Sequence, residues 1–255
     1  MSFRLKLIAL SFICSCTVLE DRDNCPCLLH LEFDESVSQV ADSVRIWIKG
    51  EGFGFVAGLS SSLYPEGITV PVTSRSGVFI TVMDSESAQE SADGSLNIPS
   101  GCQCPEVYDF RSFCETSGET AHRHITLHKN HCRVYVTFRE AASGGYSVKI
   151  DGGVCGYSSR GDFLDGDFSC APQIDGEGRF VFCIPRQKDA GLNMGIGRGD
   201  GRTRVFALGN YIEESGYDWT AEDLEDMELD VDYAASVIRL RLEPWPESES
   251  EDIVI

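Results

Sequence analysis

The sequence predicts an all-β protein with two tandem β-sandwiches, and three observations lead to this fold class. Many short stretches alternate apolar and polar residues with a period of two, which is typical of strands with one buried face. Turn-forming residues separate these stretches, and residues 219–227 are the single helical candidate, with Thr220 as its N-cap. A sandwich needs about seven strands in about 100 residues, so a chain of 255 residues has room for two.

The strand predictions follow this alternation along the chain. At residues 44–49, for example, Val44, Ile46 and Ile48 form the buried face, and Trp47 lies on the face turned to water. Strands are predicted at residues 28–33, 44–49, 125–140, 146–150, 179–184, 203–208 and 237–242, with two more in residues 67–84 around a turn at 74–77. Asp151-Gly152-Gly153 closes the strand at 146–150 as a hairpin turn. Residues 85–100 and 161–178 are predicted loops, and the pattern at 108–113 is too irregular to assign.

The chain begins with the features of an export signal. Two basic residues precede an apolar run at residues 7–13, which is far shorter than the roughly 20 residues of a membrane-spanning helix. Ile13-Cys14-Ser15-Cys16 has the form of a lipobox, whose last cysteine becomes the first mature residue and carries a diacylglycerol. We therefore predict lipidation of Cys16. An ordinary secretory signal cut near Ser15, an N-terminal membrane helix and a cytosolic protein with an apolar start are the alternatives.

The predicted organisation has five parts. They are a lipoprotein signal peptide at residues 1–15, an acidic tether at 16–24, an N-terminal β-sandwich at 25–122, a C-terminal β-sandwich at 123–245 and an acidic tail at 246–255. The boundary between the sandwiches is placed at a polar stretch that precedes the most regular strand. Short polar segments such as the tether suit a flexible connection between a lipid and a fold.

The charge of the chain limits its partners. The 41 acidic residues outnumber the 21 basic ones, and loss of Arg4 and Lys6 with the signal takes the formal net charge from −20 to −22. A surface this acidic repels nucleic acid and anionic lipid headgroups. We therefore exclude nucleic acid as a partner.

Eleven cysteines are many for a chain of this length, and nine remain once Cys14 is removed and Cys16 is lipidated. In an exported protein they are disulfide candidates first and metal ligands second. Cys25-Pro26-Cys27 and Cys102-Gln103-Cys104 form a matched pair, for which we predict two parallel disulfides that clamp the first strand to the loop at Gly101. A four-sulfur zinc site and unpaired thiols are the alternatives, although zinc ligands usually have two to four residues between them. Nine is odd, so at least one thiol is free or pairs between molecules.

The other clusters of reactive side chains predict no metal, cofactor or catalytic site. His122, His124, His128 and His131 lie close in sequence, but on an extended segment His131 faces away from the other three. The acidic residues at 161–178 lack the calcium-loop pattern, and the glycines at 195–201 lack the third glycine of a dinucleotide fingerprint. Arg198-Gly199-Asp200 is an integrin-type tripeptide of a length that recurs by chance. Without a nucleophile elbow, zincin helix or phosphate loop, the sequence favours a binding or structural protein over an enzyme with a small-molecule substrate.

Several motifs together resemble the fimbrium anchoring subunit family, the fimbrial anchor lipoproteins of Gram-negative anaerobes. Near the N-terminus the resemblance is carried by the lipobox cysteine and by the Glu-Asp-Arg-Asp-Asn-Cys-Pro-Cys run at residues 20–27 with the strand after it. In the second half it is carried by His124-Ile125-Thr126-Leu127 before a valine-rich strand, and by Tyr146 to Ile150 with Gly156, Gly161 and Gly166-Asp167-Phe168. At the end of the chain it is carried by Trp219, Leu224, Leu229, Val231, the strand at 237–242 and Trp245. It covers most of the mature chain and is strongest at residues 16–33 and 124–245.

This resemblance implies two transthyretin-like sandwiches in a surface-exposed lipoprotein of the outer membrane, held by lipid on Cys16 at the base of a fimbrium. It implies that the protein limits the length of the fimbrium and joins the first shaft subunit by strand addition, which we expect beside residues 237–242. The acidic residues after Cys16 resemble a surface-export signal. The alternative is a surface lipoprotein that binds a glycan or a host molecule with the same sandwiches, and Trp47, Tyr217 and Trp219 are its candidate aromatic contacts.

Overall fold

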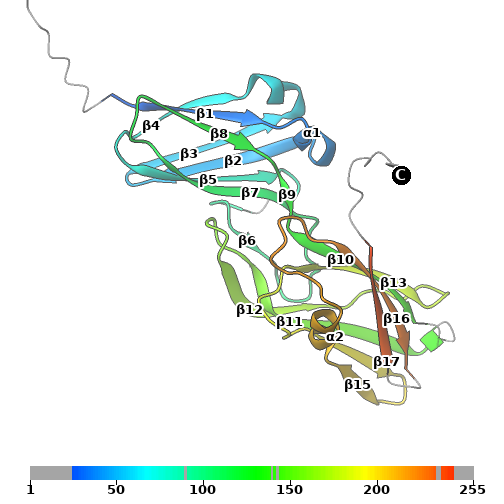
Figure 1. The fold of residues 1–255 in the computed structure, drawn as a ribbon. Helices are drawn as coiled ribbons and strands as arrows, with labels where there is room; N and C mark the ends of the chain where they lie inside the picture. The colour runs from blue at the N-terminus through cyan, green and yellow to red at the C-terminus, as the bar shows by residue number, and fades with distance from the viewer. Residues whose placement is uncertain (1–24, 89–90, 139, 142–143, 234–236, 244–255) are drawn as a thin grey trace, which may run out of the picture.

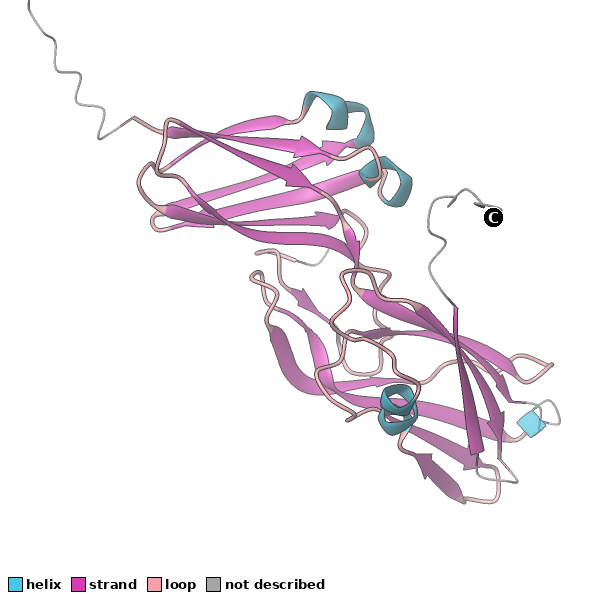
Figure 2. Ribbon diagram, in the orientation of Figure 1, coloured by secondary structure: helices cyan, strands magenta, loops and turns pink. Residues whose placement is uncertain are grey.

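The computed structural model describes residues 25–88, 91–138, 140–141, 144–233 and 237–243. The predicted all-β class is confirmed, because strands make up most of the described chain and helices are few and short (Figures 1 and 2). Two β-sandwiches follow one another along the chain, each made of two sheets. The predicted signal peptide, acidic tether and acidic tail lie outside the described residues.

The first sandwich packs a three-stranded sheet, in the order β4-β1-β8, on a five-stranded sheet in the order β3-β2-β5-β7-β9. The strands are β1 (Cys27–Phe33), β2 (Ser43–Gly50), β3 (Phe53–Ser60), β4 (Ile68–Val72), β5 (Gly77–Asp84), β7 (Tyr108–Glu115), β8 (Thr120–Ile125) and β9 (His128–Lys129). Short helical turns, α1 (Val37–Val40) and η2 (Ser61–Glu66), close one end. Strand β8 runs parallel to β1, and the other pairs are antiparallel. The inward faces of β1, β2, β4 and β5 form the core.

The second sandwich packs the sheet β12-β11-β14-β15 on the sheet β13-β10-β16-β17. Its strands are β10 (His131–Phe138), β11 (Tyr146–Tyr157), β12 (Phe163–Cys170), β13 (Arg179–Pro185), β14 (Asn193–Arg198), β15 (Thr203–Phe206), β16 (Asp226–Asp232) and β17 (Val237–Glu243), with a helix α2 (Leu208–Glu214). Alternate residues of β10 and β13, such as Val134, Phe138 and Phe182, fill the core between the sheets. Their period of two is what made these strands predictable.

Residues 85–88 and 91–107 form a segment that crosses from the end of β5 to the second sandwich, before the chain returns to the first sandwich as β7. We call it the crossing segment. Within this crossing segment β6 (Leu96–Asn97) pairs with Gly156 and Tyr157 of β11. Ala88, Leu96 and Ile98 belong to the same buried cluster as the core of the second sandwich. The sequence predicted only a polar loop for residues 85–100, because a segment this rich in serine and aspartate has no strand periodicity.

The crossing segment also explains why Trp47 is buried. The sequence placed Trp47 on the water-facing side of β2, but its side chain is 1% exposed and lies in the cluster that extends into the second sandwich. A Cβ at Gly94 would lie 3.3 Å from the Trp47 ring, so the crossing segment passes directly over this face. The outer face of this sheet is therefore covered around Trp47.

The boundary between the sandwiches lies later than the predicted junction of residues 122 and 123. That junction falls inside β8, which pairs with β1 along its length, and β9 still pairs with β7 of the first sandwich. The linker is therefore near Asn130, between β9 and β10. Histidines at 122 and 124 gave this stretch a polar appearance although it forms a strand with one face open to water.

The helix predicted at residues 219–227 is wrong. Thr220 donates its hydroxyl to Asp218 at 2.6 Å, and the Asp223 carboxylate accepts the backbone N–H of Lys129 at 2.6 Å. Asp218 and Thr220 thus form a local turn, and Asp223 binds a distant strand, so the stretch forms turns and β16 begins at Asp226. The helix of this region is α2, whose Leu208 and Ile212 are buried.

The hairpin turn predicted at Asp151-Gly152-Gly153 is also wrong, because β11 continues through it to Tyr157. The register against β12 shifts between Gly152 and Val154, so the two glycines form a bulge instead of a turn. Strands β3, β12, β14 and β16 were not predicted, since glycines or acidic residues occupy many of their outward positions. Strand β7 was not assigned because its pattern is irregular, with Asp109 buried and Phe113 exposed.

Gly156→Ala tests the pairing of the crossing segment with β11. Gly156 has a φ of +144°, and a Cβ there would collide with the Leu96 carbonyl oxygen. We expect this variant to lose about 2 to 4 kcal/mol of unfolding free energy in urea, because β6 must move away from β11. Gly153→Ala on the same strand is the control, since a Cβ at Gly153 meets nothing within 4 Å. Equal losses in the two variants would contradict the described pairing.

Candidate functional site

The crossing segment bonds to part of one side of the second sandwich, which we call the closed side. On this side β12 and β13 are the outer strands of the two sheets. The Gly101 N–H donates to the Ser169 carbonyl on β12 at 2.8 Å, and the Cys104 N–H donates to the Cys183 carbonyl on β13 at 3.2 Å. One backbone carbonyl on each of these outer strands is therefore bonded within the protein, near Ser169 and Cys183.

The opposite side of the second sandwich is formed by β15, α2 and β17. Strands β15 and β17 are the outer strands of their sheets, and each pairs with one neighbour. Figure 1 shows α2 beside these edges. A hollow of about 510 Å³ lies between β15 and α2, and its lining consists of Arg204, Val205, Phe206, Ala207, Asn210, Tyr211 and Glu214. We call this surface the open side.

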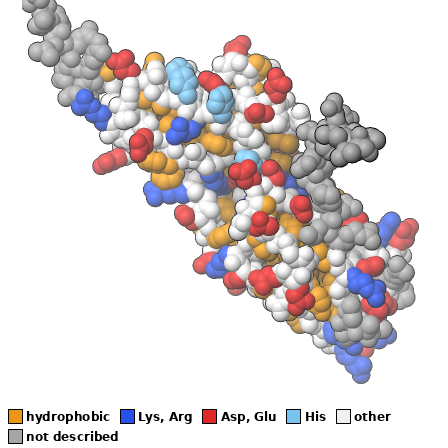
Figure 3. Space-filling view, viewed as in Figure 1, with side chains coloured by type: hydrophobic (Ala, Val, Ile, Leu, Met, Phe, Trp, Pro, Cys, Tyr) orange, Lys and Arg blue, Asp and Glu red, His pale blue; other side chains and the backbone are white. Residues whose placement is uncertain are grey.

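The end of the open side nearest β15 is basic, unlike most of the protein. Arg198, Arg202 and Arg204 surround a single acidic residue, Asp200, in and beside the turn between β14 and β15. Arg202 has a side chain that is 84% exposed and lies 3.9 Å from Asp200. Arg204 is held over the Tyr233 ring at 4.5 Å. Figure 3 shows Lys and Arg side chains gathered at this lower tip of the molecule.

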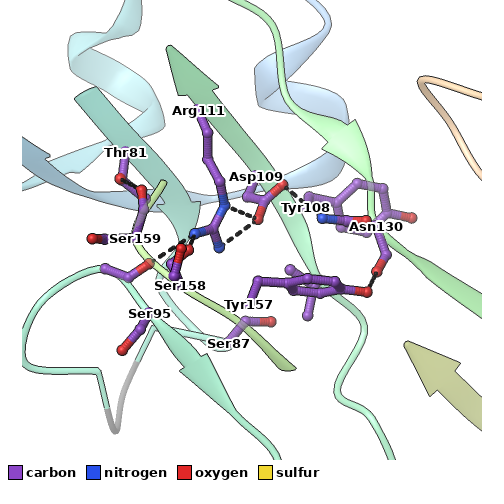
Figure 4. Close-up of polar contacts among 12 residues, drawn as sticks. Thr81, Ser87, Ser95, Tyr108, Asp109, Arg111, Asn130, Tyr157, Ser158 and Ser159 are labelled. Atoms are coloured by element: carbon purple, nitrogen blue, oxygen red, sulfur yellow. Dashed lines mark hydrogen bonds and ion pairs between the residues drawn. The ribbon is translucent and has the colours of Figure 1, made fainter. Parts of the chain in front are cut away.

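The two sandwiches meet at a polar joint built around Arg111 of β7 (Figure 4). Its Nε and Nη2 each lie 2.8 Å from Oδ2 of Asp109, and both side chains are almost fully buried. Nη1 donates to the carbonyl of Gly94 at 3.2 Å and to that of Ser158, which follows β11. The guanidinium also lies 5.9 Å from the centre of the Tyr157 ring. One cation thus contacts the first sandwich, the crossing segment and the second sandwich.

A second set of contacts fixes the linker at Asn130. The Tyr157 hydroxyl donates to the Asn130 carbonyl at 3.1 Å and accepts the Arg186 N–H at 2.5 Å. Burial raises the pKa of Tyr157 well above its usual value, so this hydroxyl keeps its proton. Arg186 Nε donates to Asn130 Oδ1 at 2.8 Å, and Nη1 donates to the Ala221 carbonyl at 2.6 Å. The residues before β16 are thereby tied to the joint.

Two charged or titratable groups beside the linker are buried. Lys129 is 2% exposed and its Nζ lies 2.5 Å from Asp226 Oδ1 on β16. His131 Nδ1 lies 3.2 Å from the Val107 carbonyl, and burial lowers the pKa of this imidazole. Direct bonds also cross the joint, since Thr81 donates its hydroxyl to the Ser159 carbonyl at 2.7 Å. The joint is therefore a fixed contact with few water-exposed groups.

The predicted disulfide clamp is not formed. All nine described cysteines are free thiols. Cys25 and Cys102 are exposed, whereas Cys27 lies in the core of the first sandwich and Cys104 in that of the second. The crossing segment carries the second Cys-x-Cys unit away from β1, so the two units belong to different domains. Burial is the largest cause that raises the pKa of the Cys27 and Cys104 thiols.

The histidines occupy three different places. His122 and His124 lie on the outer face of β8, where they contact the two carboxylate oxygens of Glu32 at 3.3 and 3.2 Å. His128 contacts Asp223 at 3.3 Å beside the linker, and His131 is buried. Within the described part of the chain, no three His, Cys, Asp or Glu side chains are grouped so as to hold a metal ion. Cys16 lies outside the described residues.

No helix among the described residues is long and apolar enough to span a membrane. The acidic residues at 162–167 lie on the exposed face at and near the start of β12, and the Arg198-Gly199-Asp200 tripeptide lies at the end of β14. Sequence reasoning missed the joint, because Arg111, Asp109 and Tyr157 are far apart in sequence and form no motif. The one available signal was an acidic and a basic residue two positions apart, Asp109 and Arg111, between the apolar residues of an unassigned stretch.

Comparisons with known proteins place the fold. No family model matches the sequence, and no curated protein matches it. Among solved structures, a protein described as a candidate polysaccharide-binding protein of Bacteroides thetaiotaomicron has a TM-score of 0.63 at 12% identity, covering 89% of this chain and 99% of its own. The fimbrial anchor protein Mfa2 of Porphyromonas gingivalis has a TM-score of 0.56 at 13% identity, covering 87% and 98%. A candidate adhesin of Bacteroides ovatus has a TM-score of 0.55 at 12% identity, covering 90% and 98%.

These likenesses extend over nearly the whole of each neighbour, so both sandwiches are shared. At such low identities they establish the fold. The fold resemblance inferred from the sequence motifs is therefore confirmed by a solved fimbrial anchor.

Arg111→Met tests the joint. This change leaves the Asp109 carboxylate buried with only a 3.4 Å contact from the Asn130 amide, so we expect a loss of about 3 kcal/mol in unfolding free energy. The double variant Asp109→Asn with Arg111→Met removes both charges and is expected to recover part of that loss. Arg202→Met, at a side chain that is 84% exposed, is the control and is expected to change stability little. If Arg111→Met unfolded at the wild-type urea concentration, Arg111 would not secure the joint.

Proposed function

We propose that this chain is an outer-membrane lipoprotein that anchors a fimbrium to the cell surface and limits its length. The observation that carries the proposal is the shared fold with a solved fimbrial anchor across both sandwiches, together with a second sandwich whose outer strands are bonded to the crossing segment on one side and are β15 and β17 on the other. Fimbrial and adhesive proteins of this fold act at the cell surface, which is where we place this one.

The membrane attachment in this proposal is covalent. Lipid on Cys16 would hold the mature N-terminus, because two or three acyl chains anchor a protein durably whereas one chain does so only marginally. The described chain begins at Cys25, and β1 starts two residues later. Figure 1 shows this start at the end of the first sandwich that lies away from the second. The start of the described chain and the open side are thus at opposite ends of the molecule.

The contact with the fimbrium in this proposal is made by strands. Strand addition to a free sheet edge gains backbone hydrogen bonds along its length, and the alternating side chains set the register. The edge at β17 (Val237–Glu243), predicted from the sequence as the neighbour of the shaft, lies on the open side. A subunit that is fixed in the membrane at one end and bound to the first shaft subunit at the other would end the fimbrium at its base, and so limit its length.

The alternative, a glycan- or host-binding lipoprotein, is supported by the neighbour described as a candidate polysaccharide-binding protein. The aromatic side chains expected to contact a glycan do not form an exposed surface. Trp47 is 1% exposed and Tyr217 is 8% exposed, and Trp219 packs edge-on against Tyr217 with ring centres 4.6 Å apart. The geometry therefore favours the anchor. Neighbours of this fold are described as adhesive, fimbrial or binding proteins, and the proposal includes no catalytic step.

Replacement of Cys16 by Ala in the producing bacterium tests the anchor. We expect the variant cells to release their fimbriae into the medium, measured as the fraction of shaft protein in the cell-free supernatant and by electron microscopy of the cells. Cys25→Ala is the matched control, because Cys25 is an exposed free thiol just beyond the tether. Cells with Cys16→Ala that keep their fimbriae as firmly as the control would rule out lipid anchoring through this residue.

A further inference from the structure

The free edges of the second sandwich differ in how accessible they are. The crossing segment bonds to β12 and β13. The edge at β12 also carries an ion pair between Lys188 and Asp165, 2.6 Å apart. On the open side, β15 has three successive exposed residues, Thr203, Arg204 and Val205. At 68% exposure Val205 is the most exposed large apolar side chain among the described residues. An apolar, exposed outer strand is a template for pairing with another chain.

The register of β14 and β15 identifies which backbone groups of β15 are not bonded to β14. The Arg198 N–H donates to the Arg202 carbonyl at 2.8 Å, so these two residues form a hydrogen-bonded pair. Pairs in an antiparallel ladder alternate between bonded and non-bonded. The pairs of Thr203 with Gly197 and of Val205 with Gly195 are then non-bonded. The N–H and C=O groups of Thr203 and Val205 therefore point away from β14, toward the open side.

These backbone groups face a space that suits an added strand. The hollow of about 510 Å³ between β15 and α2 has the edge of β15 as one wall and residues of α2, including Asn210 and Glu214, as the other. Neighbouring strands lie about 4.8 Å apart, so a strand placed beside β15 would enter this hollow and cover Val205. The α2 helix itself is fixed by its buried Leu208 and Ile212.

The charge at this edge indicates the chemistry of the occupant. The turn between β14 and β15 and the start of β15 carry three arginines and one aspartate, in a chain whose net charge is −20. A strand with Asp or Glu at the matching end would meet this basic tip, and complementary charge raises the rate of encounter and fixes the register. A basic or neutral strand would gain no such contact.

From these observations we infer that β15 is the edge that receives the shaft subunit, and that the incoming segment is an extended, acidic strand bonded to the backbone of Thr203 and Val205. This inference rests on the proposed anchoring function and names the strand and the chemistry of its partner. It places the contact at β15 on the open side, across α2 from the edge at β17.

Val205→Pro tests the inference in the producing bacterium. Proline has no N–H, and because the Val205 N–H points away from β14, the ladder within the protein is left intact. The extended backbone of β15 also suits the residue before a proline. We expect the cells to display the variant anchor at wild-type level and to shed fimbriae to the same extent as cells with Cys16→Ala. Val205→Thr keeps both the N–H and the branched shape, and is expected to keep the fimbriae attached.

Val56→Pro is the matched control in the first sandwich. Val56 is 51% exposed on the outer strand β3. The two-residue turn at Glu51 and Gly52 makes Gly50 and Phe53 a hydrogen-bonded pair, and alternation along the ladder then makes the pair of Trp47 with Val56 non-bonded. The N–H of Val56 therefore points away from β2, as that of Val205 points away from β14. This variant is expected to retain fimbriae. Equal shedding from Val56→Pro and Val205→Pro, or firm attachment with Val205→Pro, would overturn the assignment of β15.

Arg202→Glu tests the same contact if the Val205→Pro variant fails to reach the cell surface. Its side chain is 84% exposed, so folding is expected to be unaffected, while an acidic partner strand would be repelled and more shaft protein shed. Unchanged attachment with Arg202→Glu would overturn the acidic partner. The two proposals can fail separately. If cells shed fimbriae with Cys16→Ala but not with Val205→Pro or Arg202→Glu, the assignment of β15 alone is refuted. If they shed fimbriae with Val205→Pro but not with Cys16→Ala, the lipid anchor alone is refuted.

Discussion

The crossing of residues 85–107 from the first sandwich into the second is the constraint on which the rest of the structure depends. Because β6 is a strand of the second sandwich although it lies between β5 and β7 of the first, the two domains cannot separate without loss of sheet hydrogen bonds. The same segment buries Trp47 and supplies the Gly94 carbonyl to Arg111. It also bonds to β12 at Ser169 and to β13 at Cys183, whereas it makes no such bond to the outer strands of the open side among the described residues. The joint and the difference between the two sides of the second sandwich therefore have a common origin.

This arrangement is suited to carrying tension between a membrane and a filament. The chain enters the first sandwich through β1 and leaves it through β8 and β9, and β1 and β8 are parallel neighbours. Tension applied at the start of β1 and the end of β8 would shear this pair, and the hydrogen bonds along its length would resist together. At the linker, Asn130, Tyr157 and Arg186 hold the next strand, β10, in the middle of its sheet. The proposed anchor thus carries load along strands instead of across a flexible connection.

The sequence predicted the strands whose inward residues are large and regularly spaced. The alternation of Val134, Val136 and Phe138 in β10 is enough to identify it, and β2, β13 and β17 follow in the same way. The strand prediction failed where glycine or acidic residues occupy the outward face, as in β12 and β14, because these residues are also typical of loops. Prediction from the sequence failed again at residues 219–225, where Asp218 forms a local turn with Thr220 and Asp223 binds the distant Lys129 instead of supporting a helix. The joint and the open side depend on contacts between distant segments, and no local pattern encodes them.

The central claim is that the shaft meets the second sandwich only on its open side, and site-specific photocrosslinking in cells tests it most directly. A photoreactive residue placed at Asn210, exposed on α2 beside β15, is predicted to crosslink to the shaft subunit. The same residue placed at Cys102, exposed in the crossing segment on the closed side, is predicted to give no such product. Crosslinking of the shaft subunit from position 102, with none from position 210, would contradict the account.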